Sequence, residues 1–541
     1  MKTLNIIHFV FRLWLAAVAL LSVSCTKEPE TQELTDVTET PTTLTLTVAH
    51  PDAILVRSKA DDKGPYDIPY TEAESAVRNL VFFIFDVDSE GNESINTKQI
   101  FEVTGPEFED GLYTFRRGLH IEPGKKHIYV AANITAEHLK MTLDAVESNS
   151  SFRMEDVILA GDTPDAALAN VIRDDMTHTG QGTDILMFAQ AFSGDVGTPE
   201  YEIEIIDSSS ETYHIGAQLK RLVTKVLVTC KEGEAGFVAS GGKFIIPTAD
   251  IRYCLNTTAK QIYLKERYNE TAGINEDTDW KLQNYSDMTG EDSYLSRYFY
   301  CYGSDLIGRI QDPRYSTVPQ AYDESKLQLD KNHYTEGLYC LENTVDRNGL
   351  TTITDETARF ATTHIAIKAR MIPRLIQRMD LSDMNLTGYE NQHAGGTGFW
   401  YWKNALVAGI DEKDENRPYP AGTYWALTQD GVTTYYGKGG RDTMIAQNKA
   451  TLSEFVKYEG GYSWFYTFIE GGINTTDGNI LSYVGDSYWG VQRNNYYIVN
   501  ISGIKKTGEP EPAGDFIRIN SQTTEWVSRG SDEVVINPIG E

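Results

Sequence analysis

Few residues in this chain have the types and spacing that chemistry needs. The segment GDSYWG places Ser487 beside Asp486, and a hydroxyl nucleophile needs both a base and an orienting acid close to it. The chain has ten His residues and lacks the GxSxG and HExxH patterns, and it also lacks GxGxxG and P-loop spacings. We therefore predict no catalytic residue, no cofactor and no enzymatic activity.

The segment DVDSEG resembles the start of a calcium-binding loop. It offers carboxylates at Asp86, Asp88 and Glu90. The twelfth position of such a loop normally supplies a bidentate Glu, but it is Thr97 here, and no helical pattern flanks the segment. We therefore predict a β-turn with acidic edges and no metal site.

Cys25 is the third chemical feature. It follows a basic start and the apolar run from Leu13 to Leu21, which is too short to span a bilayer and is typical of an export signal. A Cys directly after the small residue Ser24 resembles the lipoprotein signal of bacteria, in which the Cys becomes the lipidated N-terminus. We predict lipidation at Cys25, with ordinary signal cleavage near Ser24 as the alternative. The polar segment after it is predicted to be a disordered tether.

The tether leads into a strand and then into an accessible basic residue. In TLTLTVA, the apolar residues Leu44, Leu46 and Val48 alternate with threonines, which predicts a β-strand with one inward face. Arg57 follows in an open stretch that a protease could reach. The sequence thus places a strand directly before a potential cleavage site.

The net charge limits the possible partners. The chain has 541 residues, 78 acidic and 48 basic, and this net charge of −30 argues against nucleic acid or anionic membrane surfaces as partners.

The apolar patterns indicate sheets. The segment from Val77 to Asp86 is apolar on both faces, which predicts a central strand. A fresh strand begins in the segment from Ala217 to Glu232, with Val226 and Val228 on one face. Short strands with turns between them on both sides of residue 215 predict antiparallel sandwiches.

Four further cysteines stand outside the signal. None has CxxC spacing, so neither a zinc site nor a redox pair is predicted. They either form disulfides or are buried free thiols, and we favour buried thiols. They are Cys230, Cys254, Cys301 and Cys340.

Taken together and in order, several segments resemble a known family. The chain resembles the fimbrillins, the shaft pilins of Bacteroidales-type fimbriae, and most closely the Mfa-type major subunit. The matching segments are the signal ending at Cys25, VRNLVFFIFD, IYVAANI, KRLVTKVLV, YCLENT, ATTHIAIKAR, FWYW, GVQRNNYYIVNISGIKKTGEPEP and TEWV.

The resemblance implies a mainly all-β fold. It consists of two tandem transthyretin-like antiparallel β-sandwiches with short helices and long loops. The expected parts are a lipoprotein signal (1–25), a tether with a removable first strand (26–57), an N-terminal sandwich (58–215), a C-terminal sandwich (216–512) with an insertion near 255–335, and a donor-strand segment (513–541).

The resemblance also implies a mode of assembly. Fimbrillins are exported as precursors held in the outer membrane by lipid, and a trypsin-like protease then cuts after a basic residue, here Arg57, with Lys59 and Lys63 as alternatives. The cut removes the first strand, and a strand from the next subunit fills the gap. The partners are neighbouring copies in a head-to-tail fimbrium at the cell surface, with accessory tip and anchor subunits. Candidate residues of the donor strand are Trp526, Val534, Val535 and Ile536.

Other functions stay open on the sequence. An anchor subunit would keep its lipid and its first strand, and a tip subunit would lack a donating tail. A surface lipoprotein could instead bind glycan through aromatic residues such as Trp400, Tyr401 and Trp402. In a monomeric lipoprotein, residues 43–48 would form a permanent edge strand.

Overall fold

In the computed structural model of the chain, strands dominate and the helices are short. The longest described helix, α3 (Ala136–Ser148), has 13 residues. No described helix is long and apolar enough to cross a membrane. The fold is therefore mainly β, as predicted. The structure describes residues 42–49, 74, 76–104, 112–119, 121–148, 152–172, 184–194, 199–206, 212–234, 237–238, 240–269, 274–275, 299–300, 305–322, 337–346, 363–385, 422–474, 482–494, 496–512 and 534–536.

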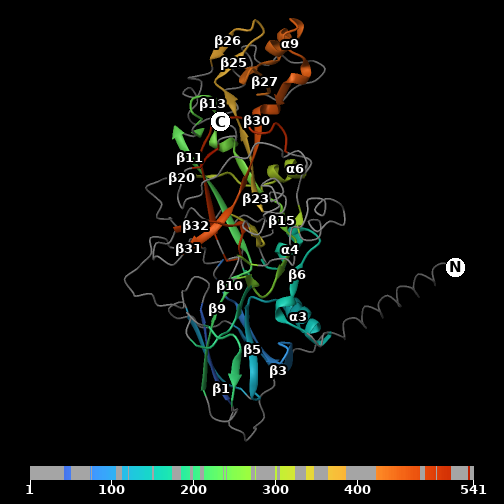
Figure 1. Ribbon diagram of the computed structural model, residues 1–541, viewed down its shortest axis with the longest axis vertical. Coiled ribbons are helices and arrows are strands. Elements are labelled where there is room, and N and C mark those ends of the chain that lie inside the picture. Colours follow the sequence, from blue (N-terminus) through green and yellow to red (C-terminus); the bar gives the residue numbers. More distant parts are fainter. Residues whose placement is uncertain are drawn as a thin grey trace, which may run out of the picture.

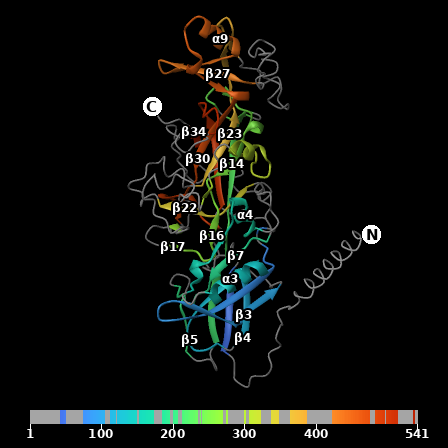
Figure 2. The same cartoon turned by 90° about the vertical axis from the view of Figure 1, so that its right-hand side faces the viewer.

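The described elements form a rod, with the N-terminal strands at the lower end of Figure 1 and α9 at the upper end. Figure 2, turned by 90°, shows the same order along the long axis. The N-terminal strands and the most distant C-terminal strands therefore lie at opposite ends of the molecule. This separation matters for any contact that links copies end to end.

Two sheets form the first sandwich, at the lower end. The smaller has the order β4-β1-β9, and the larger has the order β10-β7-β5-β2-β3, with β8 also paired to β5. Their facing side chains share one buried core that includes Val48 of β1 and Phe82 of β2. The strands are β1 (Thr42–Ala49), β2 (Asn79–Val87), β3 (Glu93–Thr104), β4 (Leu112–Leu119), β5 (Gly124–Ala132), β7 (Met187–Gln190), β8 (Ile203–Ile205), β9 (Thr212–Gln218) and β10 (Lys220–Arg221).

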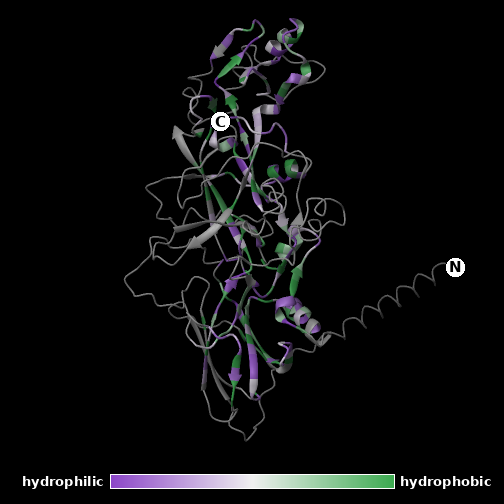
Figure 3. Ribbon diagram, in the orientation of Figure 1, coloured by the Kyte–Doolittle hydropathy of each residue, from purple (hydrophilic) through white to green (hydrophobic). Residues whose placement is uncertain are grey.

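Strand β2 is buried on both faces, which confirms the prediction from its sequence. Phe82 and Ile84 face the core shared with β1. Phe83 and Phe85 face the opposite way, into a second core that also holds residues of the C-terminal half. Alternate side chains of a strand point to opposite faces, so a strand that is apolar throughout must lie between two layers. Figure 3 shows green, apolar stretches among the strands at the lower end and a mixture of colours on α3.

The second sandwich lies above the first. One sheet has the order β12-β11-β33-β34, with β20 and β21 also paired to β11, and it faces the sheet β14-β23-β30. Val226 and Val228 of β11 lie in the core between them, as predicted. The strands are β11 (Thr224–Glu234), β12 (Phe237–Val238), β14 (Arg252–Asn256), β20 (Gln320–Tyr322), β21 (Leu338–Cys340), β23 (His364–Arg370), β30 (Tyr462–Phe468), β33 (Tyr496–Ile504) and β34 (Val534–Ile536).

Most described strand pairs are antiparallel, but each sandwich also contains parallel pairing. Strand β1 is parallel to β9, and β11 is parallel to β33 and to β20, while β34 is parallel to β33. Parallel neighbours need a long crossover between them. The strands of the pairs β1–β9 and β11–β33 are accordingly far apart in the sequence, and most strands of their sandwich lie between them.

A further five-stranded sheet caps the upper end of the rod, with the order β26-β25-β28-β27-β29. Its strands are β25 (Leu375–Gln377), β26 (Asp383–Asn385), β27 (Tyr424–Gln429), β28 (Val432–Tyr436) and β29 (Phe455–Tyr458), and α9 (Lys438–Ala446) packs on it. The remaining described elements are η1 (Met154–Asp156), α4 (Pro164–Ala169), β13 (Phe244–Ile245), η2 (Thr248–Asp250), β15 (Thr258–Ala259), β17 (Tyr268–Asn269), β18 (Ile274–Asn275), β19 (Phe299–Tyr300), α6 (Leu306–Gln311), β22 (Asn343–Asp346), β24 (Ile372–Pro373), η9 (Leu452–Glu454), η10 (Glu459–Gly461), β31 (Glu470–Asn474) and β32 (Ser482–Val491).

The two sandwiches meet through a shared strand pair. Strand β6 (Ile158–Ala160) of the first half pairs with β16 (Gln261–Tyr263) of the second. The predicted boundary near residue 215 falls inside β9, which pairs with β1, and the chain enters the second sandwich between β10 and β11. The stretch 255–335, expected as an insertion, includes β15, β16, α6 and β20, so its described part belongs to the packed body.

Candidate functional site around the first strand

Strand β1 is the middle strand of its sheet. It pairs antiparallel with β4 along its whole length, from Thr42 opposite Leu119 to Ala49 opposite Leu112. On its other side it pairs parallel with β9. We name the space between β4 and β9, which β1 fills, the β1 slot. A strand in such a slot is hydrogen-bonded on both edges, so the alternative of an edge strand does not describe β1.

The β1 slot opens onto the core of the first sandwich. Val48 is fully buried there. Its neighbour in register on β9 is Ala217, and Leu46 is in register with Ile215, both of them core residues. Leu44 and Leu46 share the face of Val48 by strand alternation, while the placement of their side chains lies outside the described residues. The predicted inward face of the strand is therefore confirmed at Val48.

The two strands that border the β1 slot, β4 and β9, differ in their other hydrogen-bonded partners. Among the described residues, β4 is hydrogen-bonded to no strand other than β1. Strand β9 has a second hold, because Gly216 and Phe192 exchange two backbone hydrogen bonds of 2.8 and 2.9 Å. A Cβ on Gly216 would lie 3.2 Å from the Phe192 ring, so this close approach favours glycine. Loss of β1 would leave β9 still bonded to Phe192, and it would leave β4 without a partner strand among the described residues.

A buried polar cluster stabilises the sheet behind the slot. Glu93 of β3 accepts hydrogen bonds from Tyr129 Oη at 2.5 Å and from the Met154 amide, and it lies 2.6 Å from His127 Nδ1. Burial by itself would raise the pKa of Glu93, but the hydrogen bonds from His127, Tyr129 and Met154 outweigh it and lower that pKa. The same burial, with the Glu93 charge beside it, raises the pKa of Tyr129. Glu93 is therefore a structural carboxylate.

The acidic segment after β2 is a turn, as predicted. Asp88 Oδ1 accepts hydrogen bonds from the amides of Glu90 and Asn92, both at 2.8 Å, and Gly91 adopts φ +80°. The hydrogen bonds from Asn92 and from the turn amides lower the pKa of Asp88. Asp86 forms an ion pair with Lys126 instead of facing the same point. Within the described ranges, no three His, Cys, Asp or Glu side chains converge on a metal position.

The serine noticed in the sequence lies in a strand. Ser487 lies within β32, whose partners are β22 and β31. A hydroxyl in a strand interior lacks the exposed turn that a nucleophile needs. The aromatic segment 399–402 lies outside the described residues.

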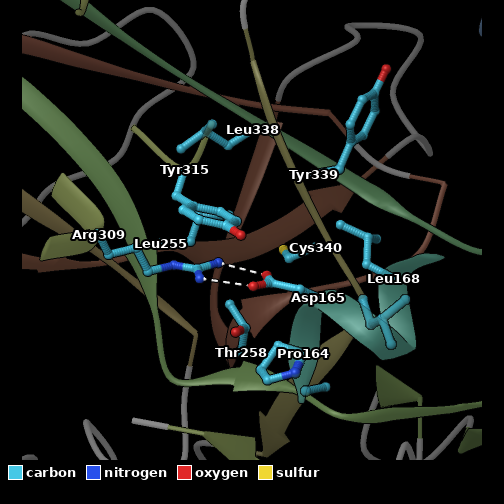
Figure 4. A pocket seen from close by; sticks show the side chains of 12 residues that line it. Pro164, Asp165, Leu168, Leu255, Thr258, Arg309, Tyr315, Leu338, Tyr339 and Cys340 are labelled. Carbon is cyan, nitrogen blue, oxygen red and sulfur yellow. Dashed lines mark hydrogen bonds and ion pairs between the residues drawn. The ribbon is translucent and has the colours of Figure 1, made fainter. Parts of the chain in front are cut away.

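A small pocket lies where α4, β21 and α6 meet, and sequence reasoning did not find it. Figure 4 shows Arg309 pointing toward Asp165, with its ring neighbour Tyr315 beside it. Arg309 donates to both Asp165 oxygens, at 3.2 and 2.9 Å. The enclosed space is about 20 Å³, room for about one water molecule and far below the ~300 Å³ of ordinary ligand sites. The pocket is therefore a packing feature of the junction.

Three of the cysteines are buried as thiols and not joined in disulfides, which confirms our preference for buried thiols. They are Cys230, Cys254 and Cys340. Burial raises the pKa of Cys254 to about 12, with Arg309 opposing it weakly, and burial also raises the pKa of Cys340. Cys301 lies outside the described residues.

The other predicted site residues divide into two groups. Cys25, Arg57, Lys59, Lys63 and Trp526 lie outside the described residues. Val534, Val535 and Ile536 form β34, which pairs parallel with β33 of the same chain. The structure thus places these three residues in a strand at the edge of the second sandwich, and nothing in the pairing brings them to the β1 slot.

Two family models match the chain. Residues 42–198 match the family described as "Major fimbrial subunit protein (FimA)", and this match begins at the first residue of β1. Residues 456–530 match "Major fimbrial subunit protein type IV, Fimbrillin, C-terminal". No curated protein matches the chain.

Several solved structures are similar to the chain, all at low identity. A fimbrilin (FimA) from Porphyromonas gingivalis is 11% identical with a TM-score of 0.37, and the match covers 88% of this chain and 94% of the other. The tip fimbrial protein Mfa3 of the same organism is 13% identical with a TM-score of 0.30, covering 62% and 81%. A fimbrial assembly protein from Parabacteroides distasonis is 10% identical with a TM-score of 0.28, covering 62% and 86%.

Proposed function

We propose that this chain, a fimbrillin by the two family models that match it, is a shaft subunit that polymerises by donor-strand exchange. Both families are fimbrial subunits, so the chain is a structural subunit at the cell surface, and a non-enzymatic role is suggested. The matched models name FimA and fimbrillin, and the finer likeness to the Mfa-type major subunit stays a prediction.

The position of β1 is the observation that carries the proposal. A strand that is the middle member of its sheet, and that precedes a stretch with Arg57, can be cut from the body of the chain without breaking any later element. Its removal would expose the core around Val48 and leave backbone groups of β4 and β9 unpaired. Both exposures are costly in water. A strand from another copy would restore both contacts, which is β-addition between chains.

The contact is directional. The β1 slot lies at the lower end of the rod, while the donated segment follows β33 in the second sandwich. A donor that follows the second sandwich and an acceptor in the first sandwich build an open head-to-tail filament. Burying an eight-residue strand on both edges and one face would remove on the order of 1,000 Å² from water, which is typical of durable interfaces.

Maturation follows from the same arrangement. Lipid at Cys25 would hold the precursor in the outer membrane, and a trypsin-like protease would cut after Arg57, with Lys59 and Lys63 as alternatives. The cut would separate β1 and its tether from the rest. The candidate donor residues are Trp526, Val534, Val535 and Ile536.

The first test is N-terminal sequencing, with intact mass, of the protein sheared from the cell surface. A start at Ser58 without lipid would support removal of β1 and a shaft role. A start at lipidated Cys25 would overturn that role and indicate an anchor subunit or a surface lipoprotein that keeps β1. The variant Arg57→Ala should slow maturation, while Arg314→Ala, at an exposed position outside both the cut stretch and the β1 slot, should not.

A further inference from the structure

Arg493, in the turn between β32 and β33, forms the most deeply buried ion pair among the described residues. Its partner is Glu342, and the two side chains are only 2% and 1% exposed. The Arg493 Nε donates to Glu342 Oε1 at 2.6 Å, and the Arg493 amide donates to Oε2 at 3.1 Å. A buried ion pair is retained only when further hydrogen bonds satisfy it.

Those further hydrogen bonds reach the strand that joins the two sandwiches. Arg493 donates to the carbonyls of Tyr263 and Leu264, at 2.9 and 3.2 Å. Tyr263 is paired with Ile158 across the β16–β6 pair, and the Leu264 amide donates to Val157 at 2.9 Å. Arg493 is therefore hydrogen-bonded to Tyr263 and Leu264, the same two residues that pair with the first half of the chain.

The next residue, Asn494, is hydrogen-bonded to the segment where the chain passes from the first sandwich to the second. Asn494 has φ +59°, a left-handed conformation that Asn tolerates better than most residues. Its amide donates to Val223 at 2.9 Å, and its Oδ1 accepts from the Arg221 amide at 3.1 Å. Arg221 is the last residue of β10 and Val223 lies between β10 and β11, where the chain passes from one sandwich to the other.

The same contacts continue to the first residue described after β1. Arg221 Nε donates to the Glu74 carbonyl at 3.0 Å. The Glu74 carboxylate, almost fully buried, pairs with Lys225 at 2.7 Å and accepts from Tyr339. Glu74, the first described residue after β1, is thus held at the junction.

We infer that the Arg493–Asn494 turn is a coupling element that makes the two sandwiches one rigid rod. Its hydrogen bonds reach the β6–β16 pair and the β10–β11 link directly, and they reach Glu74 through Arg221. In a filament, tension between the β1 slot and the C-terminal donor passes through this junction. Arg493 and Asn494 are positioning residues, because they set the angle between acceptor end and donor end without touching either.

The inference deepens the proposed function, since stiffness matters only if copies join end to end, but it is testable on unpolymerised chain. Spin labels at Tyr201→Cys and Ile307→Cys, both exposed positions in different sandwiches, report the distance between them. Cys25 and Cys301 are changed to Ser, and the buried cysteines stay. The unaltered junction should give one narrow distance distribution.

Two variants loosen the junction to different degrees. Asn494→Gly keeps the left-handed backbone and removes only the side-chain acceptor for Arg221. Arg493→Lys keeps the charge but cannot reach Glu342 and both carbonyls together. Each should broaden the distance distribution while circular dichroism shows that both sandwiches stay folded. Asp165→Asn, which weakens the more exposed Arg309 pair at the same junction, is the matched control and should broaden it less.

An unchanged distribution in both turn variants would overturn the inference. Its failure is distinct from failure of the proposed function, which depends on the N-terminus of surface protein. If Arg493→Lys does not fold, Asn494→Gly still decides the question. Broadening by Asp165→Asn equal to that of the turn variants would assign the coupling to the junction as a whole and overturn the role of the turn.

Discussion

The β1 sheet and the β11 sheet differ in how many partners hold each central strand. Both contain a parallel pair of strands that are distant in sequence, β1–β9 and β11–β33. Strand β11 has β33 on one edge and β20, β21 and β12 as further partners. Strand β1 joins only β4 and β9, and β4 has no other partner strand among the described residues. The central strand of the β11 sheet therefore has several partners, while the pairing in the β1 sheet depends on β1 alone.

This difference teaches where the molecule can lose a strand. In the second sandwich, removing any one neighbour leaves β11 paired. In the first, removing β1 opens a core and frees β4 at once. Among the described strands, β1 is the central member of its sheet although it precedes every other described strand of its sandwich in the sequence.

Removal of β1 should have the largest effect. A chain that begins at Ser58 should lose cooperative unfolding of the first sandwich, a loss comparable with the whole ~5–15 kcal/mol of a domain's stability. The second sandwich should keep its own thermal transition, measured by calorimetry. A peptide of residues 42–49 added in trans should restore the lost transition.

The control for this experiment is the same peptide with Leu44, Leu46 and Val48 changed to Ser. It keeps the backbone donors and acceptors but lacks the apolar face, so it should not restore the transition. Equal rescue by both peptides would contradict the role assigned to that face.

Glu93→Gln should have the next largest effect. Hydrogen bonds to charged groups contribute about 1.5–3 kcal/mol each, so the variant should lose about 3 kcal/mol at neutral pH. The pKa of Glu93 is lowered in the folded chain, so its stabilisation is present above the unfolded pKa near ~4.3 and is lost as pH falls through the folded value. Denaturant titrations at several pH values should show the two proteins converging in acid.

The matched control is Glu454→Gln in the capping box before β29. The pKa of Glu454 is also lowered, by hydrogen bonds from Thr451, but this carboxylate is fully exposed. It should change stability little at any pH. A similar loss in both variants would mean that burial does not distinguish them.

Val48→Ala should cost somewhat less, about 2 kcal/mol, because it removes buried apolar surface from one end of the β1 slot. Val456→Ala in β29 removes the same atoms from a side chain that is 43% exposed, and its effect should stay within ~0.5 kcal/mol. Chemical denaturation of both variants gives the comparison. Equal losses would show that β1 contributes no more than a surface strand.

The smallest expected effect concerns the thiols of the second half. With the pKa of Cys254 at about 12 and Cys230 and Cys340 also buried, a thiol reagent at pH 8 should label none of them in the folded chain. With Cys25 and Cys301 changed to Ser, labelling should stay equally slow after β1 is removed. Faster labelling would show that loss of β1 reaches the second sandwich.

Local pattern was enough to predict several elements. Alternation in residues 43–48 indicated β1, the doubly apolar run of residues 80–85 indicated that β2 is covered on both sides, and Val226 and Val228 marked the core face of β11. The turn at Asp88 and Gly91 followed from residue types alone. These features depend on neighbours within a few residues, which is the range that a sequence pattern expresses directly.

Other features depend on partners that no local pattern names. Ser487 lies in a strand because β22 and β31 pair with β32, and the boundary near residue 215 falls inside β9 because β1 pairs there. The Arg493–Glu342 pair joins residues 151 positions apart, so neither residue signals it alone.

By itself, the sequence determined that the chain is mainly β, that residues 43–48 form a strand with an inward face, and that a basic residue follows it. Only the tertiary structure decided that this strand is the middle member of its sheet and, in the part of the chain that the structure describes, the one partner strand of β4. The physical reason is that strand alternation is a property of the backbone of each segment. The position of a strand in a sheet depends on hydrogen bonds and core contacts with distant segments, here β4 (Leu112–Leu119) and β9 (Thr212–Gln218).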